Sequence, residues 1–524
     1  MKPTSITAIK WIFRLLLGLC VAAGLGTPLS AQKILLKNVV IYDGSGKKAH
    51  RGDVRIHGDR IAAVGHLKPQ PGEQVRDEHG LALAPGFIDM HSHADSGIFD
   101  DLNAENVVRQ GITTVFVGQD GESQYPLADF FAKLEKQPAS MNFASMAGHG
   151  TLREQVMGKG KELLRPSRPE ELERMKHLLA QEMQAGAYGL SSGLEYDAGH
   201  FATTDEMVAL SSVAAQFGGF YISHVRDEGN KVFESFQEIL EIGRGAHIPV
   251  EISHIKLATT PVWHMAPTRM PRIFAEAKAS GVDLKADVYP YTYWQSTLRV
   301  IVLDRDYFNQ AKVAKVIAEN GGADHIRLAR FQPDPSLAGK TLDQIAKQWG
   351  VTPAEAYGRL VKSTMPGADG KTPEEGIIAT TMSEDDVRWF IANPHIMFCT
   401  DGALHDRHPR GAGAFPRVLG RYVREEKVLS LPAAIHKMTA MPAAQLGLRD
   451  RGRVAPGYIA DLVVFDPATV IDRSTVSDPE APPQGIPQVM VSGVWVVDGG
   501  KVTGAHPGKV LRHAPPAALS VPAL

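Results

Sequence analysis

The sequence predicts an α/β fold, in which a TIM-like (β/α)8 barrel carries a small discontinuous β-sandwich and an inserted lid. From about residue 85 to residue 447, short apolar strands alternate with amphipathic stretches. This rhythm indicates parallel strands in either a barrel or a doubly wound sheet. Polar residues directly follow several of these strands, which favours the barrel, because such barrels gather their chemistry at the carboxyl ends of the strands.

Both ends of the chain show only β-type patterns. A strand over residues 34–42 is closed by an Asp-Gly turn, and residues 54–64 alternate about a Gly-Asp turn, a pattern that indicates a hairpin. The other end repeats this order, with a strand at 461–465 and a hairpin at 489–497. We therefore expect the two ends to meet in one β-sandwich, with the barrel inserted between them.

Polar, helical-looking sequence interrupts the α/β rhythm between residues 305 and 380, and we interpret it as a lid over the site. The last residues are rich in Ala and Pro, a composition typical of disorder. The predicted parts of the chain are a signal peptide (1–31), a discontinuous β-sandwich (32–84 and 448–511), a barrel (85–447, with the lid at 305–380) and a disordered tail (512–524).

Composition excludes some classes of protein. The chain has 524 residues, of which 44% are hydrophobic and 22% charged, enough for a large core and more than one domain. The net charge of −2 gives no basic face for a nucleic-acid partner. Of the two cysteines, Cys20 lies in the predicted leader, so Cys399 is left without an internal disulfide partner.

The leader has the features of a secretory signal. Lys2, Lys10 and Arg14 make its start positive, residues 15–25 are apolar, and residues 29–31 offer a cleavage site. An uncleaved anchor is the alternative, but the apolar run is shorter than the roughly 20 residues that a membrane span needs. We expect a periplasmic or secreted bacterial protein without a stable membrane anchor.

Two histidines end the first predicted barrel strand. His91 and His93 follow the run Phe-Ile-Asp-Met at 87–90, which is apolar except for Asp89, and residues two apart in a strand point to the same face, about 7 Å apart. Neutral imidazoles in this arrangement suit Zn²⁺. The alternative is that both are structural polar residues of a loop.

Two later strands end in a similar way. His224 and His254 each follow a strand and a serine, and each precedes a basic residue two positions later, Arg226 and Lys256. Equivalent histidines on successive strands indicate further metal ligands at the same end of the barrel. Buried, hydrogen-bonded histidines are the alternative.

Two aspartates also follow strands. Asp401 follows the strand 396–398, and a carboxylate beside a metal can take a proton from water and return it to a leaving amine. Asp120 follows the strand 113–117 and either ligates or bridges metal or caps the amides of a turn. Glu122 is an alternative donor.

These motifs carry a resemblance to a known family. The segment Gly86–His93, the segment 452–464 and the split β-sandwich together resemble the amidohydrolase superfamily. Four shorter motifs are similar to those of the N-acyl-D-amino-acid deacylases (D-aminoacylases): Ser223–Arg226, Ser253–Lys256, Tyr289–Tyr291 and His408–Arg410. The similarity covers nearly the whole mature chain.

The resemblance implies a zinc centre. His224 and His254 would hold a tightly bound Zn²⁺, and His91 and His93 would form a second, weaker site, so one or two ions are expected. Asp120 departs from the family, because D-aminoacylases typically place a cysteine ligand there. A carboxylate can still ligate or bridge zinc, but it is a harder donor than a thiolate.

The resemblance also implies the residues that act on substrate. Asp401 would be the catalytic acid and base. Lys256, Tyr289, Ser296 and Arg410 would contact the substrate, with Arg410 as a bidentate clamp on its carboxylate.

The function that the resemblance implies is zinc-dependent hydrolysis of a linear amide, namely deacylation of small N-acyl-D-amino acids to a carboxylate and a free D-amino acid. A cyclic amidase or dipeptidase of the same superfamily and a non-catalytic exported binding protein are the alternatives. The sequence specifies neither the acyl group, the side chain and the stereochemistry of the substrate nor the oligomeric state.

Overall fold

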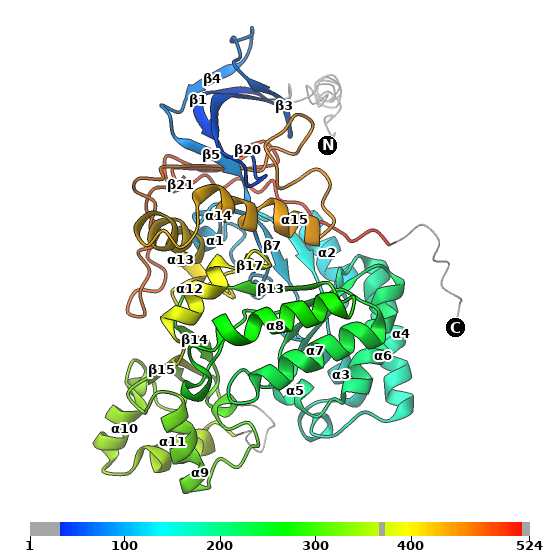
Figure 1. Cartoon of the computed structure of the whole chain (residues 1–524), viewed down its shortest axis with the longest axis vertical. Helices are drawn as coiled ribbons and strands as arrows, with labels where there is room; N and C mark the ends of the chain where they lie inside the picture. Colours follow the sequence, from blue (N-terminus) through cyan, green and yellow to red (C-terminus); the bar gives the residue numbers. More distant parts are fainter. Residues whose placement is uncertain (1–31, 366–371, 516–524) are drawn as a thin grey trace, which may run out of the picture.

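The computed structural model describes residues 32–365 and 372–515. The signal peptide predicted at 1–31 lies outside the described residues. Figure 1 shows a β-rich part at the top, a central barrel wrapped by helices and an inserted lobe at the bottom. Among the described residues, no helix combines the length and the apolar character that crossing a membrane requires.

Eight parallel strands form a closed barrel, which confirms the predicted fold class and excludes the doubly wound sheet. The third strand is broken at Met146 into two short pieces, each paired with one neighbour. The last strand joins the first, because the Asp401 N–H donates to the His91 carbonyl at 2.8 Å and the His93 N–H donates to the Gly402 carbonyl at 2.9 Å. The strands in barrel order are β6 (Phe87–Asp89), β7 (Ile112–Val117), β8 (Asn142–Ser145) with β9 (Ala147–Gly148), β10 (Gly189–Gly193), β11 (Phe220–His224), β12 (Val250–Ile252), β13 (Leu284–Val288) and β17 (Ile396–Phe398).

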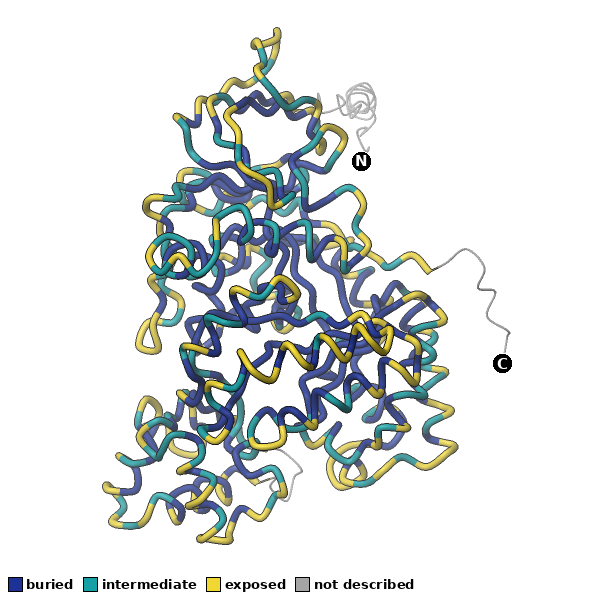
Figure 2. Tube along the Cα trace, viewed as in Figure 1, coloured by how far each residue is buried: buried dark blue, intermediate teal, exposed yellow. Residues whose placement is uncertain are grey.

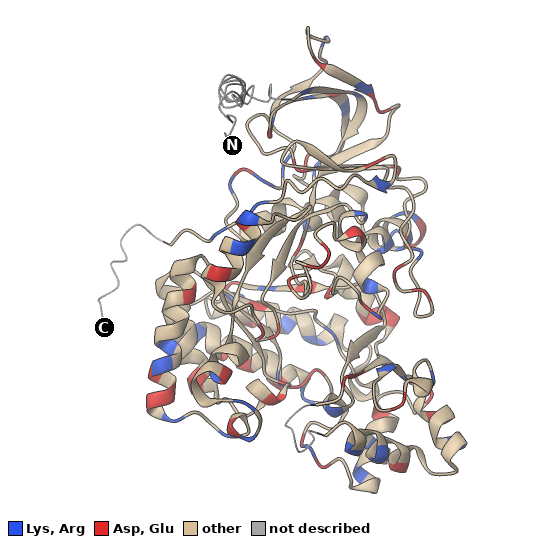
Figure 3. Ribbon diagram, turned by 180° about the vertical axis from the view of Figure 1, so that it is seen from behind, with Lys and Arg blue, Asp and Glu red and all other residues tan. Residues whose placement is uncertain are grey.

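Amphipathic helices cover the outside of the barrel. The helix α7 buries Phe233, Phe236 and Leu240 at helical spacing against the strands, and Figure 2 shows that such helices keep their outer faces exposed. Figure 3 shows Lys and Arg interspersed with Asp and Glu along these helices. The helices are α1 (Glu105–Val108), α2 (Leu127–Lys136), α3 (His149–Met157), α4 (Pro169–Ala185), α5 (Asp197–His200), α6 (Thr204–Gln216), α7 (Val232–Ala246), α8 (Ala266–Ala279), α12 (Glu384–Ala392), α13 (Arg410–Arg417), α14 (Leu431–Met438) and α15 (Ala440–Gln445), with the short turns η1 (Gly160–Leu163) and η2 (Thr260–Val262) and the π-helix η5 (Val418–Glu425).

The two ends of the chain meet in one curved sheet of nine strands. Its core is shared, because Ile34 and Ile56 from one end pack in the same buried cluster as Leu462 and Met490 from the other. The ends join where β18 pairs antiparallel with β5. The strands are β1 (Lys33–Ile41), β2 (His50–His57), β3 (Arg60–Gly65), β4 (Gln74–Asp77), β5 (Ala82–Pro85), β18 (Leu462–Phe465), β19 (Gln488–Val491), β20 (Val494–Asp498) and β21 (Lys501–Val502).

The insertion between β13 and β17 begins earlier than residue 305. Its first strand, β14 (Tyr293–Ser296), pairs with its last strand, β16 (Glu375–Thr380), so the lobe is closed by its own antiparallel sheet. The remaining elements are η3 (Leu298–Ile301), α9 (Gln310–Glu319), β15 (Ile326–Phe331), η4 (Pro335–Leu337), α10 (Leu342–Trp349) and α11 (Pro353–Ser363).

The last described residues lie against the barrel rather than in the β-sheet. The Phe143 N–H of β8 donates to the Lys509 carbonyl at 2.9 Å, and the Leu511 N–H donates back to Phe143 at 2.7 Å. The His513 N–H donates to the Gly186 carbonyl at 3.0 Å, so the backbone beyond residue 511 is still bonded to the barrel, although the sequence predicts a tail there. Residues 516–524 of that predicted tail lie outside the described part.

Candidate metal centre and active site

Four predicted histidines meet at the carboxyl ends of the barrel strands. His91 and His93 lie just beyond β6, His224 is the last residue of β11, and His254 lies two residues beyond β12. The ring centroids of His91 and His254 are 4.7 Å apart, and those of His224 and His254 are 4.8 Å apart. Residues separated by more than 160 positions in the sequence therefore share one small site, as strand ends in a barrel must.

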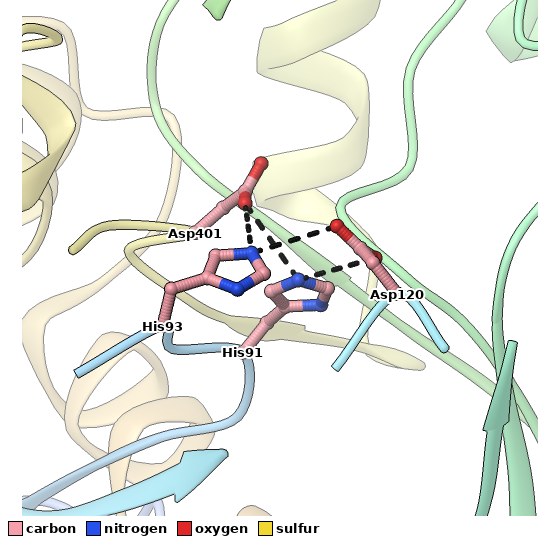
Figure 4. Close-up of side chains that lie close together, drawn as sticks. All are labelled: His91, His93, Asp120 and Asp401. Atoms are coloured by element: carbon pink, nitrogen blue, oxygen red, sulfur yellow. Dashed lines mark ion pairs between the residues drawn. The ribbon is translucent and has the colours of Figure 1, made fainter. Parts of the chain in front are cut away.

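Two carboxylates, those of Asp120 and Asp401, lie among these rings, and Figure 4 shows them beside His91 and His93. Asp120 Oδ1 is 3.4 Å from His91 Nε2 and 3.2 Å from His254 Nε2, whereas Asp120 Oδ2 is 3.5 Å from His93 Nε2. Asp401 Oδ1 lies 3.6 Å from His91 Nε2 and 3.3 Å from His93 Nε2. The two oxygens of Asp120 thus face different histidines, which is the arrangement of a bridging carboxylate.

The backbone at this mouth is bent so that the side chains turn inward. Asp120, His254 and Asp401 have positive φ angles of 55°, 33° and 50°, in the left-handed region that side chains other than glycine rarely adopt. Such conformations persist only where the surrounding structure holds them, and they cluster at functional sites.

The histidines and aspartates at the barrel mouth are suited to bind a divalent metal ion. Both ring nitrogens of His91 are buried and have no hydrogen-bond partner among the described residues. The ligand atoms of His91, His93, Asp120 and Asp401 all lie within 4.8 Å of one another, as do those of Asp120, His224 and His254. Imidazole nitrogens with carboxylate oxygens are a donor set of zinc sites, and Asp120 belongs to both groups.

The electrostatics of the site favour a cation. Burial and the Lys256 ammonium lower the pKa of His254, but the Asp401, Asp120 and Glu228 carboxylates outweigh them and raise that pKa to about 10. Burial raises the pKa of Asp401, but the Arg410 and His254 charges hold it well below its usual range. Carboxylates that stabilise a proton on a buried imidazole so strongly also stabilise a metal ion in its place.

Three of the four predicted substrate residues line one side of this site. Arg410 Nη1 lies 2.5 Å from Asp401 Oδ2, and its guanidinium carbon is 4.8 Å from the ring centroid of Tyr289. Lys256 Nζ is 5.7 Å from the same ring centroid and donates to Glu228 Oε1 at 2.6 Å. The Tyr289 hydroxyl is buried and has no hydrogen-bond partner among the described residues.

Ser296, the fourth predicted substrate residue, comes from the inserted lobe and stays a prediction. It belongs to β14 and pairs with Ile377 of the inserted lobe, and within the described residues its side chain bonds to no other predicted site residue. Its neighbour Gln295 donates to Asp406 Oδ1 at 2.7 Å, and Asp406 Oδ2 is 3.9 Å from Arg410 Nε. Gln295 is therefore linked to the Arg410 end of the site through Asp406.

Sequence reasoning missed two buried glutamates behind the histidines. Glu195 Oε2 lies 3.0 Å from His224 Nε2, and Glu228 Oε1 lies 3.2 Å from His254 Nδ1. Glu195 lies as far beyond its strand as His254 does, so the strand-end signal that identified the other candidates was also available for Glu195. The available clue was position, because Glu195 follows β10 by two residues and Glu228 follows His224 by four.

The sequence matches the amidohydrolase family over residues 74–330 and 340–497. The D-aminoacylase of Alcaligenes xylosoxydans xylosoxydans is 35% identical over 508 residues, which cover 92% of this chain and 97% of that protein. The N-acyl-D-glutamate deacylase of the same organism is 36% identical over 90% of this chain and 95% of its own length.

The fold has matching relatives among solved structures. The N-acyl-D-glutamate deacylase of Bordetella bronchiseptica, solved with zinc and a phosphonate inhibitor that mimics the tetrahedral intermediate, superposes with a TM-score of 0.81 at 32% identity. That match covers 92% of this chain and all of the other. This chain therefore belongs to the amidohydrolase family, in its N-acyl-D-amino-acid deacylase (D-aminoacylase) branch.

Proposed function

We propose that this protein is a zinc-dependent hydrolase that removes the acyl group from small N-acyl-D-amino acids, releasing a carboxylate and a free D-amino acid. The observation that carries this proposal is the gathering of four imidazoles and two aspartates at the barrel mouth, directly beside the Arg410 guanidinium. The names of the relatives, D-aminoacylase and N-acyl-D-glutamate deacylase, support the substrate class.

The two groups of ligand atoms indicate which residues would hold each zinc ion. His224, His254 and Asp120 would hold one zinc ion, and His91 and His93 would hold a second that shares Asp120. Bound zinc supplies a Lewis acid and a water whose pKa is lowered to about 7.

The proton carrier in this proposal is Asp401. Its Oδ1 faces His91 and His93 and its Oδ2 is held by Arg410, so one oxygen is left on the side where a zinc-bound water would lie. Asp401 Oδ1 takes a proton from the attacking water and returns it to the amide nitrogen as the bond to the acyl carbon breaks. The Tyr289 hydroxyl, which has no hydrogen-bond partner in the described part of the chain, is placed to donate a hydrogen bond to the carbonyl oxygen as its charge develops.

Arg410 has a second task, recognition of the substrate carboxylate. A guanidinium binds a carboxylate through two parallel hydrogen bonds, and here it already binds the carboxylate of Asp401. An acyl amino acid brings a carboxylate of its own to this buried cation, which distinguishes it from a neutral amide.

The test is turnover of zinc-loaded protein with matched N-acetyl-D- and N-acetyl-L-amino acids. We expect hydrolysis of the D series and much slower hydrolysis of the L series. Faster turnover of the L series, or no turnover of either series by protein that contains zinc, would overturn the proposal.

We also propose that the protein is exported. The positive start and the apolar run of residues 15–25 support this proposal. Fractionation of the producing cells tests it, because a protein that remains cytoplasmic and keeps its leader contradicts export.

A further inference from the structure

A buried carboxylate lies directly behind one of the proposed zinc ligands. Glu195 follows β10 by two residues, where Gly193 of β10 is in register with His224 of the parallel strand β11. The Leu194 N–H donates to the His224 carbonyl at 3.0 Å. The backbone that carries Glu195 is therefore bonded to the backbone that carries His224.

The two nitrogens of His224 have different surroundings. Nε2 lies 3.0 Å from Glu195 Oε2, whereas Nδ1 lies 3.0 Å from His254 Nε2 and 4.0 Å from Asp120 Oδ1. A carboxylate accepts but does not donate, so the hydrogen bond to Glu195 places the imidazole proton on Nε2. The lone pair is then on Nδ1, which faces the metal ligands.

We propose that Glu195 is a positioning residue that orients His224 and directs its Nδ1 lone pair at the zinc ion, an inference that rests on the proposed zinc-dependent function. A carboxylate hydrogen-bonded to the outer nitrogen of a ligating histidine fixes its tautomer and ring orientation and makes the inner nitrogen a stronger donor. Within the described residues, no Lys or Arg lies within salt-bridge distance of the Glu195 carboxylate, so no fixed cation competes with His224 for it.

The inserted lobe holds this arrangement in place. Arg305 donates to the Glu195 backbone carbonyl at 2.8 Å and to Asp197 Oδ1 at 3.0 Å. The guanidinium thus bonds the Glu195 backbone on one side of Tyr196 and the Asp197 side chain on the other. Because its backbone is already held, Glu195 loses less conformational freedom when its carboxylate binds the ring, which favours a positioning role.

The same atoms allow another arrangement, in which Glu195, His224 and Glu228 hold a cation of their own. The surroundings disfavour it, because Lys256 Nζ already donates to Glu228 Oε1 at 2.6 Å. An ammonium at that distance repels a metal ion and neutralises the carboxylate that would bind it.

The test measures zinc affinity by chelator competition and the visible spectrum of cobalt-substituted protein. Glu195→Ala removes the hydrogen bond, and we expect the zinc Kd to rise about tenfold to hundredfold and the cobalt spectrum to change. Glu195→Gln keeps an oxygen that accepts from Nε2 but loses the charge, so we expect a rise of only about threefold to tenfold with the cobalt spectrum retained.

Glu241→Ala is the matched control, since Glu241 is an exposed glutamate on α7 and is expected to leave zinc affinity unchanged. Wild-type zinc affinity and cobalt spectrum in Glu195→Ala would overturn the inference alone. If the alanine variant does not fold, a zinc Kd for Glu195→Gln within twofold of wild type would overturn it as well. A wild-type protein that binds no zinc would overturn the proposed function and this inference together.

Discussion

Arg410 and Asp401 form a buried ion pair at the barrel mouth, with Nη1 of the guanidinium 2.5 Å from Oδ2 of the carboxylate. The other oxygen of Asp401 faces His91 and His93. The pair thus joins the proposed proton carrier to the proposed carboxylate clamp, and a substrate carboxylate has to share or replace an existing partner of Arg410. This arrangement allows the two roles to be separated by experiment.

Asp401→Asn is expected to lower kcat by about 100-fold to 10,000-fold, because the amide cannot carry the proton from water to nitrogen. Zinc held by His224, His254 and Asp120 should remain, since these ligands are untouched. Steady-state kinetics combined with metal analysis checks both statements. Ordinary activity in this variant would show that Asp401 is not the proton carrier.

Arg410→Ala is expected to reduce discrimination in favour of substrates with a free carboxylate. Losing a charge-assisted hydrogen bond costs about 1.5–3 kcal/mol, or about tenfold to hundredfold in affinity. The measurement compares kcat/KM for an N-acetyl-D-amino acid and for its amide, in which the carboxylate is blocked. Any effect through Asp401 acts on both substrates, so an unchanged ratio between them would contradict the clamp.

Asp120→Ala is expected to lower the zinc content per chain, because the two groups of ligands share this residue. Asp120→Cys supplies one soft sulfur in place of two oxygens, so it should keep zinc while binding Mn²⁺ less well than wild type does. Metal analysis after dialysis against equal zinc and manganese compares the three proteins. Full zinc content in the alanine variant would remove Asp120 from the ligand set.

Lys437 is predicted to make stability rise with pH. Burial lowers its pKa from 10.5 to about 7, although the ammonium donates to the Ile391 and Asn393 carbonyls. Between these two pKa values the unfolded chain binds more protons than the folded chain, so the free energy of unfolding increases as pH rises. The slope contributed by one group is at most about 1.4 kcal/mol per pH unit.

Urea unfolding of wild type and Lys437→Met at pH 7.5 and pH 9.5 checks this prediction. Wild type should gain resistance to urea between the two pH values relative to the variant, which lacks the titrating group. Equal changes in both proteins would show that Lys437 keeps an ordinary pKa in the folded state.

The predictable part of the site consists of residues at strand ends or just beyond them. His91, His224 and Asp401 could be identified because parallel strands in a barrel place their carboxyl ends at one mouth, whatever their separation in the sequence. Glu195 and Glu228 also lie just beyond strand ends, but they contact the outer nitrogens of His224 and His254, and no periodicity fixes the direction of a side chain in such loops. Their roles depend on distances that only the folded chain provides.

The boundaries of the inserted lobe and of the carboxyl-terminal segment were harder to predict, because they also depend on contacts between residues far apart in the sequence. The insertion begins with β14 because Tyr293–Ser296 pairs with β16, more than eighty residues later in the sequence. The segment around Leu511 is held by Phe143 of a distant strand. Such pairings leave no local pattern, whereas the hairpins at the two ends of the chain carry their turn signals with them.

The contact between the last and the first barrel strand has a consequence for how the enzyme is synthesised and folded. Thr400 bonds to Asp89 across 311 positions of the chain, so His91 and His93 leave the ribosome long before Asp401 is synthesised. Closing so long a loop costs entropy that is repaid only once the last strand docks. The complete active site therefore forms only late in synthesis. An amino-terminal fragment that stops before β17 contains the four histidines of this site but lacks Asp401.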